Sequence, residues 1–260
     1  MSYQFIDYSV TEQVATIALN RPERRNALDL TMRAEFADAI GTALTDDAVR
    51  VLLLAGNGGH FCAGGDMRSM NPDQPIDGVN GRRRMKSLHK ALRALLETDK
   101  PVIAAVDGSV YGGGFGNALM ADMIVATARA RFCLSFVRVG LVPDCGVLYT
   151  LPRVIGLNRA KALVMSGREI DGERAREMGI VDEVVAPEAL RAHAQALGRT
   201  LASDSADMLA MAKHGLNLSL ESGMNAMFEY EATAQGVAFS SDFHRNAVRE
   251  FLDRSRKDKP

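Results

Sequence analysis

The sequence has no tryptophan, only three cysteines and almost no net charge. Its 31 lysines and arginines nearly balance 32 aspartates and glutamates, so electrostatics do not favour a nucleic acid or an anionic membrane surface as a partner. No apolar run approaches the length that a bilayer requires. The first residues also lack a basic segment followed by an apolar one. We therefore expect neither a membrane anchor nor a secretion signal.

The few cysteines indicate a reducing compartment. Cys62, Cys133 and Cys145 cannot all pair with one another, and their spacing does not match a metal site. An odd, widely spaced set of this kind is typical of free thiols in an intracellular protein. We expect reduced thiols, no metal and a cytoplasmic location.

The apolar pattern predicts an α/β core followed by helices. Residues 14–19, 51–55 and 102–106 are strand-like, and helical periodicity over 30–44 and 82–97 lies between them. Strands separated by helices imply right-handed crossovers. We place the core in residues 1–200 and a helical region in 201–260. Further predictions are short strands at 123–127, 132–134 and 181–185, helices at 146–154, 157–166, 171–178 and 187–203, and breaks near Gly215, Gly223 and Ser240.

Two glycine-rich turns each follow a strand-like run. The first is Phe61–Asp66 and the second is Tyr111–Gly116. Glycine lets the backbone pass close to a ligand with its N–H groups unobstructed, so two such turns can aim two amides at one oxygen. This arrangement is an oxyanion hole, and it predicts acyl or enolate chemistry. Asn117 breaks the dinucleotide-binding pattern Gly-x-Gly-x-x-Gly, and no phosphate-loop lysine follows, so nucleotide binding by either mechanism is not expected.

Motifs spread over nearly the whole chain resemble those of one enzyme family. Each is weak alone, but their order is specific: Asn20-Arg21-Pro22 with Asn26-Ala27-Leu28, Phe61–Asp66, Lys100–Gly108 with Gly112–Gly114, Gly140–Asp144, Leu151-Pro152-Arg153 and Phe251-Leu252. Together they resemble the enoyl-CoA hydratase/isomerase family, which has the crotonase fold. The resemblance implies a ClpP-like spiral of repeated ββα units and a C-terminal helical trimerisation region. It also implies an acyl-CoA thioester substrate, no cofactor besides that coenzyme A, and a homotrimer or dimer of trimers.

The same resemblance assigns site residues by position. The oxyanion-hole amides fall on Gly65 and Gly113. Residues implied to contact the substrate, through backbone or side chain, are Arg24, Arg25, Ala63, Asp66, Met67, Arg68, Gly112, Phe136 and Phe251.

The chain departs from the hydratases of this family at both catalytic glutamates, whose positions hold Gly116 and Phe136. Hydration needs a base and an acid, so simple hydratase activity is not expected. Asp144 matches the single acid of Δ3,Δ2-enoyl-CoA isomerases, and the run around it resembles the bacterial phenylacetate-pathway isomerase branch. One carboxylate suffices to move a proton from C2 to C4 of a 3-enoyl-CoA. We expect an enoyl-CoA isomerase with Asp144 as base and then acid. Its sequence neighbours Leu141, Val142, Pro143 and Val147 predict an apolar pocket around it.

Other interpretations remain open. Asp144 also suits a turn residue that caps the following helix. His89 lies where the aryl-CoA dehalogenase branch of the family has a histidine base. That branch is implied to have a tryptophan-rich pocket, whereas this chain contains no tryptophan. Cys145 is a candidate nucleophile or an inert buried thiol. A residual hydratase and a catalytically silent acyl-CoA-binding protein are further alternatives.

Overall fold

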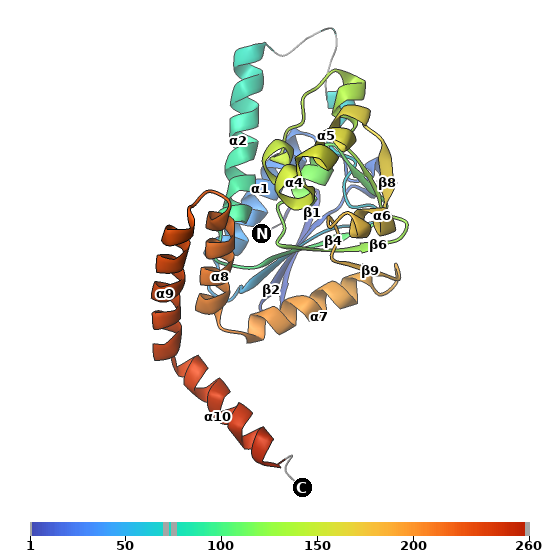
Figure 1. Ribbon diagram of the computed structural model, residues 1–260. Helices are drawn as coiled ribbons and strands as arrows, with labels where there is room; N and C mark the ends of the chain where they lie inside the picture. Colours follow the sequence, from blue (N-terminus) through green and yellow to red (C-terminus); the bar gives the residue numbers. More distant parts are fainter. Residues whose placement is uncertain (1, 70–72, 74–76, 258–260) are drawn as a thin grey trace. The chain divides into compact units, whose positions relative to one another are not determined.

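A computed structural model describes residues 2–69, 73 and 77–257 of the chain (Figure 1). The chain divides into two compact units, Met1–Ala202 and Ser203–Pro260. The first unit contains both glycine turns and Asp144, and the second consists of helices.

The first unit is organised around a six-stranded sheet with the order β1-β2-β3-β4-β6-β9. Its strands are β1 (Ile6–Thr11), β2 (Val14–Leu19), β3 (Val51–Gly56), β4 (Val102–Val106), β6 (Met123–Thr127) and β9 (Glu183–Val185). Only β1 and β2 pair antiparallel, and the other neighbours are parallel. Glu12 and Gln13, which join β1 to β2, both have positive φ, at 50° and 65°. Two such residues are what a two-residue hairpin turn requires.

A smaller sheet consists of three-residue strands, β5 (Ser109–Tyr111), β7 (Arg131–Cys133) and β8 (Glu169–Asp171). β5 pairs parallel to β7, and β7 pairs antiparallel to β8. Gly108 separates β4 from β5 and has φ of +53°; a Cβ there would lie 2.1 Å from the Gly59 carbonyl oxygen. Only glycine fits this sharp change of sheet, which carries the chain from β4 into the second glycine turn.

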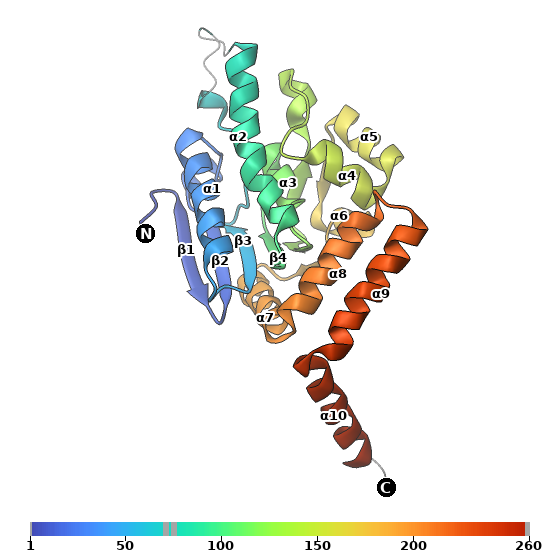
Figure 2. The ribbon, with the colours of Figure 1, turned by 90° about the vertical axis from the view of Figure 1, so that its left-hand side faces the viewer.

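Helices cover both faces of the large sheet because alternate strand residues point to opposite faces. Ile17, Leu52 and Leu54 belong to the larger buried cluster with residues of α1, and Val14, Leu53 and Ile103 belong to a second cluster with α7. Figure 2 shows α1 and α2 in front of β1–β4. The helices of this unit are α1 (Leu30–Thr45), α2 (Gly78–Glu97), α3 (Gly113–Ala118), α4 (Val147–Ile155), α5 (Leu157–Ser166), α6 (Gly172–Glu177) and α7 (Leu190–Ser203), with short 3-10 turns at Pro22–Arg24, Met67–Ser69 and Ser135–Val139.

Capping aspartates determine where the first two helices begin, and the start of α2 differs from the prediction. α1 begins as expected, because the Asp29 carboxylate accepts a hydrogen bond from the Met32 N–H at 2.9 Å. α2 begins at Gly78, four residues before the predicted start, because Asp77 caps the N–H groups of Val79 and Asn80. This aspartate cap was not predicted from the sequence. Neither were β1, β5 and β8.

The second unit contains α8 (Ala206–Ser219), α9 (Met224–Ser240) and α10 (Asp242–Lys257). The expected breaks near Gly223 and Ser240 are confirmed, but the one near Gly215 is wrong, since α8 continues through it. A Cβ at Gly215 would lie 2.7 Å from Tyr230 Cε1, and the Tyr230 hydroxyl donates to the Met211 carbonyl oxygen at 2.7 Å. Gly215 therefore allows the close approach of α8 and α9. None of the helices in the described ranges combines the length and the apolar composition that a membrane-spanning segment needs.

Candidate active site

The two glycine turns lie side by side. The Cys62 N–H donates to the Ser109 carbonyl oxygen, and the Tyr111 N–H donates to the Cys62 carbonyl oxygen, both at 2.9 Å. Gly64 has φ of +87°, and a Cβ at this position would lie 2.6 Å from the Tyr111 oxygen and 3.4 Å from the Gly113 nitrogen. Glycine at position 64 thus leaves free the space between the first turn and the backbone of Tyr111 and Gly113, which a side chain would fill.

The orientation of Gly65 follows from its bridge with Leu28. The Leu28 N–H donates to the Gly64 oxygen at 2.7 Å, and the Asp66 N–H donates to the Leu28 oxygen at 3.0 Å. In this parallel bridge, Leu28 bonds to the residues on either side of Gly65. The N–H of Gly65 therefore points away from Leu28. Gly113 is the first residue of α3, so its N–H has no partner within the helix. No described residue accepts a hydrogen bond from either amide, which leaves both available to a ligand.

Asp144 lies beside the second turn. A Cβ on Gly113 would be 3.7 Å from Asp144 Oδ1 and 3.0 Å from Cys145 Sγ. Asp144 Oδ1 is buried and has no hydrogen-bond partner among the described residues. Native proteins pair nearly all buried polar atoms, and the exceptions are frequent at functional sites. The Asp144 carboxylate is therefore not committed to a structural hydrogen bond at this oxygen.

The helix-capping interpretation of Asp144 is wrong. The N-cap of α4 is Gly146, with φ of +75°, and no side chain caps this helix. Asp144 contributes only its main-chain oxygen, which accepts from the Val147 N–H at 3.1 Å.

The apolar pocket that was expected around Asp144 is only partly formed by its sequence neighbours. Val147 is buried, but Leu141 and Val142 are 43% and 73% exposed, because they lie in the irregular segment between the 3-10 turn at Ser135–Val139 and α4.

The two positions that hold catalytic glutamates in hydratases, 116 and 136, carry no acidic side chain in this chain. A Cβ on Gly116 would lie 2.5 Å from Cys145 Cβ and 2.7 Å from the Cys145 oxygen, so the turn after Asp144 occupies the space that a side chain at position 116 needs. Phe136 is buried, and its ring Cζ lies 3.8 Å from where a Cβ on Gly112 would be. The ring therefore packs against the second glycine turn.

The other predicted contact residues occupy different surroundings. The Asp66 carboxylate is buried and pairs with Arg21 at 2.9 Å while it accepts from the Arg68 N–H at 3.0 Å, so it stabilises the first turn. The Ala63 N–H donates to the Arg25 oxygen at 2.9 Å. The exposed members of the set are Arg24, Arg25, Met67 and Arg68 in the first unit and Phe251 on α10 in the second.

Asn26 is a supporting residue whose role the motif did not reveal. It is fully buried, its Oδ1 accepts from the Arg21 N–H at 2.8 Å, and its Nδ2 donates to the carbonyl oxygens of Asn57 and His60 at 3.0 and 2.8 Å. These bonds attach the segment after β2 to the start of the first glycine turn. The only signal in the sequence was that Asn26 closely follows the Asn20-Arg21-Pro22 turn.

The thiols and histidines near the turns are poor candidates for chemistry. Burial raises the pKa of Cys62 to about 12, and burial followed by the charge of Asp144 raises the pKa of Cys145. Both therefore remain protonated near neutrality, which disfavours the nucleophile interpretation of Cys145. Burial, assisted by Arg25, lowers the pKa of His60, whose Nδ1 accepts from the Ser109 N–H at 3.1 Å. His89 is exposed on α2.

Arg33 in α1 was also missed. Its Nε is buried and has no hydrogen-bond partner in the described part of the chain. Its positive charge lowers the pKa of both Cys62 and Cys145, against the larger effect of burial. Arg33 therefore lies within electrostatic range of both thiols. The described residues contain no group of three or more histidine, cysteine or acidic side chains placed to hold a metal.

Comparisons with known proteins identify the family and the fold. A model of the family "Enoyl-CoA hydratase/isomerase" matches residues 9–259. The 1,2-epoxyphenylacetyl-CoA isomerase of Escherichia coli (strain K12) is 36% identical over 251 residues, which cover 96% of this chain and 95% of that protein. The short-chain-enoyl-CoA hydratase of Clostridium acetobutylicum is 30% identical over 243 residues, which cover 93% and 92%. A crystal structure of an enoyl-CoA hydratase/isomerase from Cupriavidus metallidurans CH34 has a TM-score of 0.91 and 37% identity, covering 98% of this chain and 95% of that one.

The chain belongs to the enoyl-CoA hydratase/isomerase family and has the crotonase fold. It is thus a member of an enzyme family that acts on acyl-CoA thioesters. The relatives carry both isomerase and hydratase names.

Proposed function

We propose that this protein is an isomerase that moves the double bond of a 3-enoyl-CoA thioester to the 2-position. The observation that carries the proposal is the placement of Asp144. Its buried Oδ1 lies 3.7 Å from the Cβ position of Gly113 and has no partner in the described part of the chain. A single carboxylate beside an available backbone amide is the minimum that such an isomerisation needs.

In the proposed reaction, the amides of Gly65 and Gly113 donate to the thioester carbonyl oxygen. Asp144 takes the proton from C2, and negative charge develops on that oxygen as the dienolate forms. Asp144 then returns the proton to C4, which leaves the double bond between C2 and C3. The mechanism uses no cofactor apart from the coenzyme A of the substrate.

The surroundings of Asp144 favour isomerisation over hydration. Addition of water to a double bond needs one group to activate the water and another to protonate carbon. Position 116 is closed by Cys145, and position 136 holds a buried phenylalanine. Asp144 therefore has no acidic partner at either glutamate position. The exposed location of His89 on α2 gives no support to a dehalogenase-type base.

Incubation with 3-hexenoyl-CoA in D₂O tests the proposal. An isomerase yields 2-hexenoyl-CoA that carries deuterium at C4, and C2 exchanges as well. A 3-hydroxyacyl product would show a hydratase instead, and binding without deuterium uptake would show a silent acyl-CoA-binding protein. Either result would refute the proposed reaction. A panel of short, medium and aromatic enoyl-CoA thioesters then defines the acyl group.

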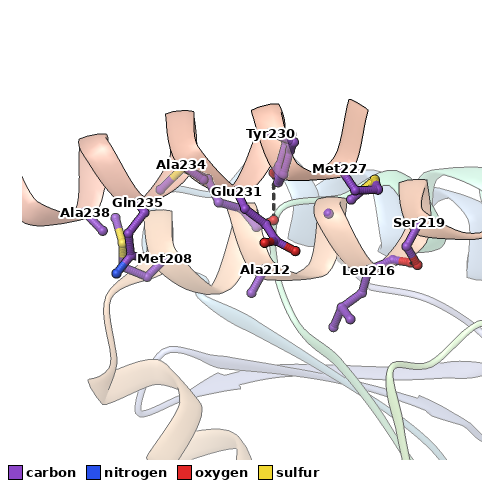
Figure 3. A pocket seen from close by; sticks show the side chains of 12 residues that line it. Met208, Ala212, Leu216, Ser219, Met227, Tyr230, Glu231, Ala234, Gln235 and Ala238 are labelled. Atoms are coloured by element: carbon purple, nitrogen blue, oxygen red, sulfur yellow. Dashed lines mark hydrogen bonds between the residues drawn. The ribbon is translucent and has the colours of Figure 1, made fainter. Parts of the chain in front are cut away.

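We further propose a homotrimer or dimer of trimers built through the second unit. α8 and α9 border a hollow of about 800 Å³ whose lining includes Met208, Leu216 and Met227 (Figure 3). The same unit exposes large apolar side chains, among them Met224 at 68%, Phe228 at 60% and Phe251 at 70%. Apolar surface of this kind is typical of an interface. Light scattering should give three or six times the mass of the chain.

We also propose a cytoplasmic location. The three buried free thiols support it, because thiols stay reduced in that compartment.

A further inference from the structure

The turn Asp144-Cys145-Gly146 packs directly onto α3 through glycine. Cys145 has φ of +50° and Gly146 has φ of +75°. The left-handed region is unfavourable for a residue with a Cβ, so surrounding contacts must hold Cys145 there. Its side chain is 2% exposed. A non-glycine residue held in this conformation next to Asp144 indicates that the position of the turn is determined by packing.

Two glycines of α3 form the surface that receives this turn. A Cβ on Gly113 would lie 3.0 Å from Cys145 Sγ, and a Cβ on Gly116 would lie 2.5 Å from Cys145 Cβ. Residues three apart in a helix share one face. The thiol therefore lies against the face of α3 that Gly113 and Gly116 share, and Gly116 leaves the space that Cys145 fills.

The charged groups around the thiol are Asp144 and Arg33. Burial and then the charge of Asp144 raise the pKa of the Cys145 thiol, whereas Arg33 lowers it; the Cys62 thiol is the other titratable neighbour. Cys145 thus stays a neutral S–H group beside a carboxylate. Because Asp144 Oδ1 has no partner among the described residues, the thiol can act as a weak donor only to the other carboxylate oxygen.

We propose that Gly116 and Cys145 form a positioning pair that fixes the Asp144 carboxylate relative to the Gly113 amide. This inference rests on the proposed isomerase function. Asp144 must reach both C2 and C4 of one bound acyl chain, so a small displacement changes how often the proton reaches C4. Position 116, which carries a glutamate in hydratases, is therefore a glycine here that makes room for Cys145, and Cys145 holds Asp144 in place.

The test measures two rates in D₂O with 3-hexenoyl-CoA: deuterium uptake at C2 of the recovered substrate, and formation of 2-hexenoyl-CoA. In Cys145→Ala we expect kcat for isomerisation to fall roughly tenfold to a hundredfold, as a misplaced catalytic group does, with KM nearly unchanged. The ratio of C2 exchange to isomerisation should change at least several-fold. Cys145→Ser keeps a donor of similar shape and should restore the ratio toward the wild-type value.

Gly116→Ala reaches the same turn without altering Asp144 or Cys145. Its methyl group would meet Cys145 Cβ at 2.5 Å and the Cys145 oxygen at 2.7 Å, so it should change the ratio as Cys145→Ala does. Cys133→Ala is the matched control, because this buried thiol donates to the Gly167 oxygen at 3.2 Å and should leave the ratio unchanged. Circular dichroism and a thermal melt establish that each variant is folded.

The outcomes separate the two proposals. If Asp144→Asn retained full isomerisation, the proposed function would fail and this inference with it. If Asp144→Asn abolished isomerisation while Cys145→Ala and Gly116→Ala left the ratio unchanged, only the positioning role would be refuted. A fall of both rates in the same proportion would show a merely structural contribution and would likewise refute it.

Discussion

Gly64→Ala directly perturbs the contact between the two glycine turns. The new methyl group would lie 2.6 Å from the Tyr111 oxygen and 3.4 Å from the Gly113 nitrogen. The first of these is a backbone atom that cannot move without moving β5. The φ of +87° at Gly64 adds strain for any residue with a Cβ. The two turns should therefore separate by a few tenths of an ångström or more.

The magnitude has two parts. The left-handed conformation by itself costs about 1–2 kcal/mol of stability for a residue with a Cβ. Separation of the turns weakens the amide pair, and loss of one oxyanion donor typically lowers kcat about 10²- to 10³-fold. Because the donors act mainly on charge that develops in the transition state, KM should change far less than kcat.

Steady-state isomerisation and thermal unfolding measure the two parts separately. Gly179→Ala is the matched control, since Gly179 has φ of +80° and no atom within 4 Å of its Cβ position. It should lose only the stability that the left-handed conformation costs, about 1–2 kcal/mol, and keep its kcat. If Gly64→Ala and Gly179→Ala had the same kcat, the contact between the turns would not contribute to catalysis and the oxyanion-hole argument would be refuted.

Three further predictions address other parts of the molecule. Asp144→Asn should lower kcat by about 10²–10⁴-fold with little change in acyl-CoA binding, and retained turnover would disprove its acid/base role. Gly215→Ala should destabilise the packing of α8 on α9, because its methyl group would meet the Tyr230 ring at 2.7 Å, whereas Gly236→Ala, with open space around it, should stabilise α9 by about 0.5–1 kcal/mol; equal melting temperatures would contradict this. Ellman's reagent at pH 8 should leave Cys62 and Cys145 unmodified in the folded protein and react after denaturation, because burial raises the pKa of both thiols; rapid labelling of the native protein would show that the thiols are accessible.

The strands that frame the site could be predicted from local pattern. β3 and β4 are almost wholly buried parallel strands, and such strands appear in sequence as continuous apolar runs between turn residues. By contrast, β5 and β8 have three residues each and depend on β7 for their pairing. A segment of that length has no measurable periodicity. The start of α2 was misplaced because the decisive signal was a single capping aspartate.

The candidate site was predictable only in its parts. Gly113 and Asp144 were identified by resemblance, but the closure of position 116 by Cys145 was not visible from either residue alone. Arg33 gave no signal either, because a single arginine in an amphipathic helix is typical of a solvated surface. The effect of Asn26 was hidden for a similar reason, as a buried asparagine cannot be distinguished from a turn residue before its three hydrogen bonds are known.

The amino-acid sequence by itself determined the apolar runs that become the central strands, the glycines that permit unusual backbone at the two turns, and the absence of both glutamates. These are local properties, because periodicity and backbone freedom depend on neighbouring residues. Only the tertiary structure decided that the backbone of Tyr111 and Gly113 lies where a side chain on residue 64 would be, and that Cys145 fills the space beside Gly116. Such contacts join residues far apart in the chain, and they arise only when strands and helices pack to the density of a folded core.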